Sequence, residues 1–209
     1  MPTLAAFSFA DLMDQGGVVM VPLIVLSVLA VTLILERTLF YLTTNTPSRI
    51  GRISQLGKLL RAGRFDEARQ RAASDRSIYG DAVNRLLDEE ITEAAAVDAV
   101  EQQRARLERF LPVLSTIITA APMLGILGTV IGIIGAFNKL SGNRADLDLN
   151  NLVGDIGEAL ITTAAGITVA LLTLFPYNLF RAQADRSLSR LESLVAAALS
   201  KNTGSTRES

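Results

Sequence analysis

Three long stretches without a charged residue constrain the fold of this chain more than any other feature. They cover Val18–Leu35, Phe110–Asn138 and Ala159–Phe180. A transmembrane helix needs about 20 consecutive apolar residues. Buried helices of soluble proteins are usually shorter, and three of them would leave a chain of 209 residues too little polar sequence to cover them. We therefore predict an all-α membrane protein with three transmembrane helices.

The first apolar stretch could also be a signal peptide. Signal peptides carry basic residues before their apolar core. Residues 1–17 contain no Lys or Arg. The first stretch is therefore predicted to be a retained transmembrane helix.

The positive charges predict how the chain is oriented. Of the 20 Lys and Arg residues, thirteen lie between Arg37 and Arg109, five follow Phe180, and only Lys139 and Arg144 lie between the second and third stretches. Basic residues near membrane spans favour the cytoplasmic side. The N-terminus is therefore expected outside and the C-terminus in the cytoplasm.

These patterns predict seven segments. Residues 43–109 carry apolar residues at helical spacing, and no helix breaker separates Val97 from Pro112, so one long helix is expected to enter the second span from the cytoplasm. The polar residues from Lys201 onward are expected to be disordered. The segments are an outer N-terminal segment (1–17), span 1 (18–42), a cytoplasmic helical region (43–109), span 2 (110–138), a short outer loop (139–154), span 3 (155–180) and a cytoplasmic helix with a disordered tail (181–209).

Composition excludes several kinds of function. Without Cys or His the chain has no disulfide, no thiol or histidine-based catalytic site, and no Cys or His ligand for a metal, so that a metal site would need oxygen ligands. No nucleophile, base and oxyanion site are arranged together, so neither an enzyme nor a cofactor is expected. The net charge of −1 disfavours a nucleic-acid partner.

Four glycines in the second span share one helix face, since they are spaced by three, four and three residues. Such small residues let membrane helices approach closely. Thr129 lies beside this stripe, so its hydroxyl points into the same seam or an adjacent lumen, although a membrane threonine often bonds only its own helix. The glycines predicted to pack helices are Gly125, Gly128, Gly132 and Gly135.

The third span begins with a costly residue, Glu158. Thr162 lies four residues later on the same face, Thr163 lies beside it, and Asp155 precedes it by one turn. An acid inside a membrane usually faces protein or water and has a function. Alternatively, Glu158 marks the outer end of the span, where a negative charge suits a helix N-terminus. Periodicity alone leaves both interpretations open.

Together these polar residues suggest a hydrated ion path. Protons are the natural ion, because carboxylates, hydroxyls and water can relay them without a cage of ligands. Three spans enclose little space, so the path would form between copies of the chain. This predicts a ring-like homo-oligomer.

Three segments of the sequence resemble the MotA/TolQ/ExbB proton-channel family. They are GGVVMVPLIVLSVLAVTLILERTLFYL (16–42), APMLGILGTVIGIIGAF (121–137) and IGEALITTAAGITVAL (156–171). The resemblance covers all three spans in order and includes a cytoplasmic insertion between the first and second, as in ExbB and TolQ.

The resemblance implies a location and an assembly. Family members lie in the bacterial inner membrane, so the N-terminus would be periplasmic. Their ring is expected to contain five subunits around the single spans of two ExbD- or TolR-like partners, which can act through a TonB-like protein. Proton flow would move the partner, which supplies the protonatable aspartate.

The resemblance also assigns residues of the path. Thr129 and Thr163 match the lumen-facing threonines of the second and third spans, and Glu158 matches the acid of the third. Many relatives carry Pro-Gly where this chain has Gly154-Asp155, so the outer mouth gains a carboxylate. Three spans rather than four disfavour the flagellar branch of the family.

Three functions remain open. An ExbB-like subunit would energise outer-membrane import, whereas a TolQ-like subunit would serve envelope integrity during division. A membrane scaffold without transport activity would use the glycines only for packing.

Overall fold

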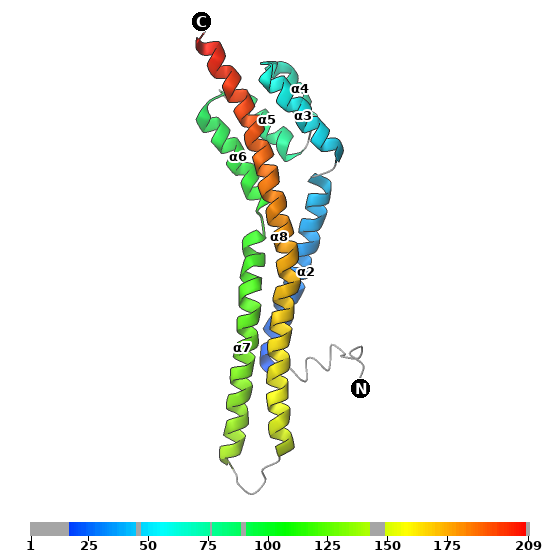
Figure 1. Cartoon of the computed structure of the whole chain (residues 1–209), viewed down its shortest axis with the longest axis vertical. Helices are drawn as coiled ribbons and strands as arrows, with labels where there is room; N and C mark the ends of the chain where they lie inside the picture. The colour runs from blue at the N-terminus through cyan, green and yellow to red at the C-terminus, as the bar shows by residue number, and fades with distance from the viewer. Residues whose placement is uncertain (1–16, 45–46, 76, 89–90, 143–148, 208–209) are drawn as a thin grey trace. The chain divides into compact units, whose positions relative to one another are not determined.

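The computed structural model describes residues 17–44, 47–75, 77–88, 91–142 and 149–207, and every regular element in these ranges is an α-helix (Figure 1). Three helical stretches are long and apolar enough to cross a membrane, namely Gly17–Thr44, Leu111–Asn138 and Ala159–Asn202. The predicted all-α fold with three candidate spans is therefore confirmed. The N-terminal segment 1–17 falls almost wholly outside the described residues.

The chain folds into two compact units. The apolar unit comprises Met1–Leu35 and Pro112–Tyr177, and the charged unit comprises Glu36–Leu111 and Asn178–Ser209. The chain passes between them three times, within helices α2 and α8 and at the start of α7.

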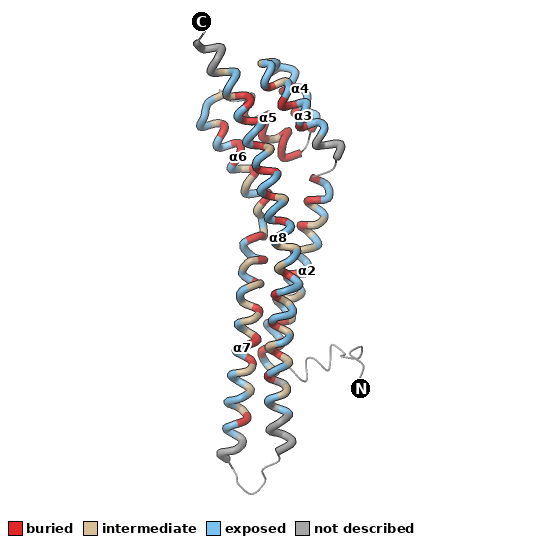
Figure 2. The backbone as a smooth tube through the Cα atoms, viewed as in Figure 1, coloured by how far each residue is buried: buried red, intermediate tan, exposed pale blue. Residues whose placement is uncertain are grey.

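Three long helices build the apolar unit: α2 (Gly17–Thr44), α7 (Leu111–Gly142) and the first half of α8 (Leu149–Arg207). Met20 and Leu23 of α2 pack against Ala121 of α7 in a small core. Only 22–28% of the residues in the most apolar window of each candidate span are buried. Buried positions recur along one side of each helix, and most of the apolar surface is left exposed (Figure 2).

Four shorter helices form the charged unit with the end of α8: α3 (Pro47–Arg61), α4 (Phe65–Ala73), α5 (Ile78–Asp88) and α6 (Glu93–Leu107). Helix α4 packs against α3 and α5, and α5 packs against α6. Helix α5 is central to the core, because Tyr79, Ala82, Val83 and Leu86 are fully buried.

The turn between α3 and α4 depends on Gly63. This glycine has a φ of 74°, in the left-handed region that favours glycine. Its N–H donates to the Leu60 carbonyl (3.1 Å) and the Arg64 N–H donates to the Leu59 carbonyl (3.0 Å). This pair of bonds is a Schellman motif, which ends α3.

The prediction of one continuous helix into the second span is wrong. Helix α6 ends at Leu107 and α7 begins at Leu111. Pro112 has no N–H to give to the carbonyl of Glu108, and its ring disfavours helical backbone in the preceding turn. The Leu111 N–H bonds the Glu108 carbonyl instead, at 3.0 Å.

The helices flanking the predicted outer loop and tail are longer than expected. Helix α7 runs to Gly142 and α8 starts at Leu149, so much of 139–154 is helical, because a helix need not end where its apolar stretch ends. Helix α8 continues to Arg207 through the residues expected to be disordered. Its last turns are anchored, since the Asn202 side chain donates to the Ile91 carbonyl at 2.9 Å. Residues 143–148 and 208–209 lie outside the described residues.

Candidate functional site

Helices α7 and α8 contact each other through very small residues. A Cβ added to Gly125 would lie 2.9 Å from Cα of Thr163, and one added to Gly128 would lie 2.5 Å from Cγ2 of Thr162. From the α8 side, a Cβ on Gly166 would lie 2.4 Å from the carbonyl oxygen of Ala121. The two backbones can approach this closely only because these positions lack side chains.

Two threonines of α8 lie in this seam. Thr163 donates its hydroxyl hydrogen bond across the interface to the carbonyl of Gly125, at 2.8 Å. Thr162 is only 1% exposed, with its methyl group against Gly128. The structure thus brings together Gly125, Gly128, Thr162 and Thr163 from the predicted set.

Thr129 makes a different contact. Its hydroxyl donates to the Ile126 carbonyl of its own helix, at 2.6 Å, and the residue is half-buried. Further along α7, Gly132 is also half-buried, whereas a Cβ on Gly135 would meet no atom within 4 Å. Gly125 and Gly128 of the predicted glycine stripe therefore pack against α8, and Gly135 meets no described residue.

Glu158 lies on the helical backbone of α8, and its side chain, like that of Asp155, is outside the described residues. Because α8 begins at Leu149, nine residues earlier, Glu158 is more than two turns from the helix N-terminus. The favourable field of a helix N-terminus fades within the first turn. That field cannot explain an acid at this position.

Hydroxyls rather than charges are the buried polar groups described in the apolar unit. Thr173 is also 1% exposed and donates to the Val169 carbonyl of α8, at 2.7 Å. No group of three or more carboxylates that could hold a metal occurs within the described ranges. The described polar groups of the seam are therefore hydroxyl and carbonyl oxygens.

The outer faces of the same helices are apolar and exposed. On α7 the exposed set includes a large aromatic residue near the far end, Phe137, at 65% exposure. Exposed apolar area of this extent is unfavourable in water, so lipid or other chains must cover it. The other exposed apolar residues of α7 are Val113, Met123, Ile126, Leu127, Val130, Ile131, Ile133 and Ile134.

Sequence analysis missed a second buried polar cluster, in the charged unit. Arg37 of α2 is 2% exposed and Tyr41, one turn later, is 3% exposed. The signal was present in the sequence, since Glu36-Arg37 ends the first apolar stretch. It indicates only a membrane boundary unless the partners of these side chains are known.

Three apolar helices with exposed apolar faces, joined to a charged helical unit, define the chain as a polytopic helical membrane protein. Its sequence matches the model of the MotA/TolQ/ExbB proton channel family over residues 67–193, more than half of the chain. The chain belongs to this family, which is one of transport proteins rather than enzymes.

Individual relatives agree with this assignment. The biopolymer transport protein exbB1 of Vibrio cholerae is 30% identical over 88% of this chain and 84% of its own length. An ExbB-like 1 protein of Synechocystis is 35% identical, over 78% of this chain and 67% of its own length. The Tol-Pal system protein TolQ of Pseudomonas aeruginosa is 34% identical, but over 44% of this chain and 39% of its own length.

Proposed function

We propose that the chain is the proton-conducting subunit of a bacterial inner-membrane motor that uses the proton motive force to do mechanical work on a periplasm-spanning partner. The seam between α7 and α8 carries the proposal, because α8 places the hydroxyls of Thr162 and Thr163 there in otherwise apolar surroundings. Family membership supports the choice of proton as the ion.

In the proposed path, Glu158, Thr129, Thr162 and Thr163 line a hydrated lumen. The Thr163 hydroxyl is held by the Gly125 carbonyl at 2.8 Å, which leaves its oxygen lone pairs to accept from water. Glu158 supplies the ionisable group of the path. An acid among apolar helices is costly unless it faces water or protein, as a lumen would allow.

The path requires several copies of the chain. A single copy buries 22–28% of the residues in its most apolar windows, so most of each span remains free to contact neighbours. The proposed assembly is a ring of five copies around two single-span partners of the ExbD or TolR type, embedded in lipid. The N-terminus is periplasmic and the C-terminus cytoplasmic, as the distribution of basic residues predicts.

The energy available to such a motor follows from the membrane potential. Each proton crossing 100 mV releases about 2.3 kcal/mol. A movement that breaks protein contacts stronger than about 2.3 kcal/mol therefore requires several protons to cross.

The partner system is proposed to be of the ExbB type, energising import through a TonB-like protein. The supporting observation is coverage, because the Vibrio cholerae biopolymer transport protein matches over 84% of its length and the TolQ protein over 39%. A TolQ-like role in envelope integrity is the alternative. Deleting the gene and scoring import against division separates the two.

The proton path is tested by replacing single hydroxyls with isosteric methyl groups. Thr163→Val and Thr129→Val, in the full chain purified with its partner and reconstituted in vesicles with an imposed potential, should each lower proton flux at least tenfold. Thr168→Val is the matched control, because the Thr168 hydroxyl is exposed and bonds only its own helix, at the Ala164 carbonyl (2.8 Å). Normal flux in a Thr129→Val/Thr163→Val double variant would exclude this path, and a scaffold would conduct no protons at all.

A further inference from the structure

An exposed apolar row on α2 continues beyond the first charged residues of that helix. Leu39 and Leu42 are 65% and 68% exposed, and Leu35 before them is 60% exposed. Residues three and four positions apart share one face of a helix, and α2 is one continuous helix. The outer row of α2 consists of Val18, Val21, Val25, Val28, Val31, Leu35, Leu39 and Leu42, all exposed.

The two charges that follow Leu35 do not belong to the outer row. Arg37 is 2% exposed, and its Nε and Nη2 donate to the two carboxylate oxygens of Glu36, at 2.5 and 2.7 Å. Its Nη1 donates to the backbone carbonyl of Arg106 at 3.1 Å. Charged residues at membrane depth are tolerated where they pair with one another or with backbone carbonyls. The Glu36–Arg37 pair meets this condition.

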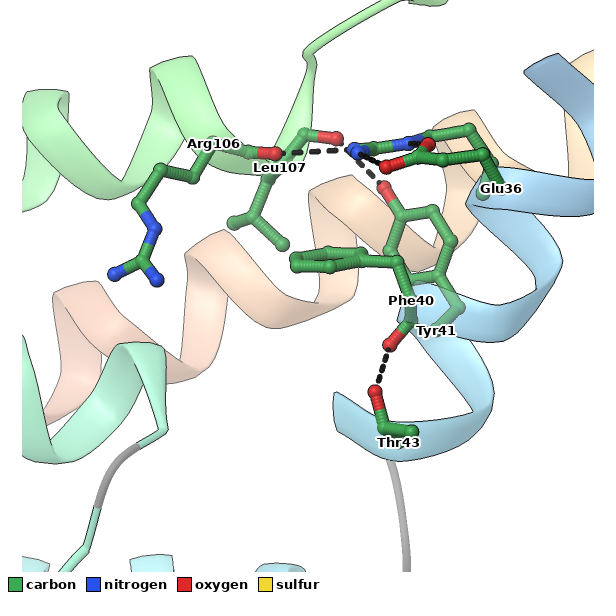
Figure 3. Close-up of polar contacts among 7 residues, drawn as sticks. Glu36, Phe40, Tyr41, Thr43, Arg106 and Leu107 are labelled. Atoms are coloured by element: carbon green, nitrogen blue, oxygen red, sulfur yellow. Dashed lines mark hydrogen bonds and ion pairs between the residues drawn. The ribbon is translucent and has the colours of Figure 1, made fainter.

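The hydroxyl groups of the same segment are also bonded within the chain. Tyr41 is 3% exposed, and its hydroxyl donates to the backbone carbonyl of Leu107 at 2.9 Å. The exposed Thr43 donates its hydroxyl to the Phe40 carbonyl of its own helix, also at 2.9 Å (Figure 3). In lipid, polar groups must find partners inside the protein, whereas in water the solvent supplies them. The end of α2 therefore has the bonding that lipid requires.

Helix α8 carries an exposed apolar row that ends at the same level. Leu179 is 63% exposed, and Phe175, four residues earlier, is 69% exposed. Among the described residues of α8, Leu179 is the last large apolar one that is exposed. The ring of Tyr41 stacks on that of Phe180, with centres 5.6 Å apart and planes 16° from parallel. Since Leu42 and Leu179 adjoin these two rings, both rows end together, as a flat membrane surface requires.

The length of the outer row agrees with an end at Leu42. With a rise of 1.5 Å per residue, Val18 and Leu35 lie about 26 Å apart along the axis, and Val18 and Leu42 about 36 Å apart. The hydrocarbon core of a bilayer is about 30 Å thick. A row that ends at Leu35 is too short to cross it, whereas a row that ends at Leu42 crosses it with a moderate tilt.

The side chains of the outer row indicate lipid rather than another helix. Membrane helices that pack closely use small residues, as α7 and α8 do at Gly125 and Gly166. The outer row contains only Val and Leu, and Ala30 of α2 is buried, at 3% exposure. Bulky branched side chains keep another backbone at a distance but are readily covered by acyl chains.

We propose that acyl chains of membrane phospholipids cover Leu39, Leu42 and Leu179 of the charged unit. The Glu36–Arg37 ion pair then lies at the depth of the hydrocarbon and not at its boundary with water. That boundary is about 10 Å further along α2 than the first charge indicates, since seven residues separate Leu35 from Leu42. The lipid contact does not depend on the proton path, because α2 supplies no residue to that path.

The experiment measures what surrounds each leucine. The chain has no cysteine, so single spin labels can be attached at Leu39→Cys, Leu42→Cys and Leu179→Cys. The full chain, purified with its partner, is studied in phosphatidylcholine vesicles. Collisions of each label are measured with molecular oxygen, which concentrates in hydrocarbon, and with a nickel complex, which stays in water. Helical circular dichroism equal to that of the unlabelled chain verifies the fold of each variant.

The matched control is an exposed apolar residue elsewhere in the charged unit. Val97 of α6 is 62% exposed and adjoins the exposed Asp98. The ratio of oxygen to nickel collisions at the three leucine positions should be at least about tenfold that at Val97→Cys, because polar solutes are excluded from hydrocarbon. Leu35→Cys, in the apolar unit, gives the value expected for a label in lipid.

Two results would overturn the proposal. A ratio equal to that of Val97→Cys at any of the three leucine positions would place that position in water and the boundary near Glu36. Protection of a label from both reagents would show that protein covers the position, as a second copy of the chain would. Ratios close to that of Leu35→Cys at all three positions would support the lipid contact.

Discussion

Replacing Gly166 with alanine tests the close approach of α7 and α8 more sharply than any other single change. The new Cβ would lie 2.4 Å from the carbonyl oxygen of Ala121 and 3.2 Å from Cα of Gly125. Both are backbone atoms, so no side chain can rotate away to make room. The helices must separate by about 1 Å to reach ordinary van der Waals distance.

The expected cost follows from that displacement. Parting the backbones by about 1 Å forfeits a quarter to a half of the dispersion energy at each contact along the seam. It also stretches the 2.8 Å hydrogen bond from Thr163 to Gly125 beyond bonding distance, which costs about 1 kcal/mol. With overpacking adding 1–3 kcal/mol, Gly166→Ala should lower the free energy of unfolding by about 2–4 kcal/mol.

Gly135→Ala is the matched control on the facing helix. Its Cβ would meet no atom within 4 Å, and alanine favours helix over glycine by about 1 kcal/mol in soluble hosts. Unfolding of the full chain in detergent, followed by helical circular dichroism during titration with a denaturing detergent, measures both variants. Equal free energies for Gly166→Ala and Gly135→Ala would refute the close contact.

Two further predictions concern the charged unit. Gly63→Ala should lower the unfolding temperature and cost about 1–2 kcal/mol, because alanine is strained at a φ of 74° and its Cβ would press on the Lys201 side chain at 3.3 Å; an unchanged melting curve would contradict the Schellman turn. Tyr79→Phe should be neutral or stabilising by up to about 1 kcal/mol, because the buried Tyr79 hydroxyl has no hydrogen-bond partner among the described residues; a loss of about 1 kcal/mol or more in the same melting assay would show a partner for it.

The spans were predictable because their signal is local. An uncharged stretch of sufficient length identifies a membrane helix whatever it packs against. Pro112 is the local signal for the end of a continuous helix near Phe110. The bonds from Arg37 and Tyr41 to the carbonyls of Arg106 and Leu107 were not predictable, because they join residues more than 60 positions apart in the sequence. The end of α6 was therefore open to prediction from the sequence, whereas the side chains that bond its last carbonyls were not.

The candidate site was also predictable only in part. Spacing placed the four glycines on one face of α7, and it could not identify the helix that each one meets. The fold assigns Gly125 and Gly128 to α8, where Thr163 and Thr162 occupy the space beside them. A pairing of this kind needs the register of two helices, which neither sequence segment contains alone.

The far end of the glycine stripe of α7, at Gly135, has no packing partner among the described residues. Gly135 faces open space, and Phe137 beside it is 65% exposed. No described residue of the chain packs at Gly135, and a glycine at this position allows the close approach of another helix. Along α7, packing against α8 is therefore described at Gly125 and Gly128, and none is described at Gly135, two to three turns further along. In the proposed ring, this end of α7 is where a neighbouring copy or a single-span partner would pack.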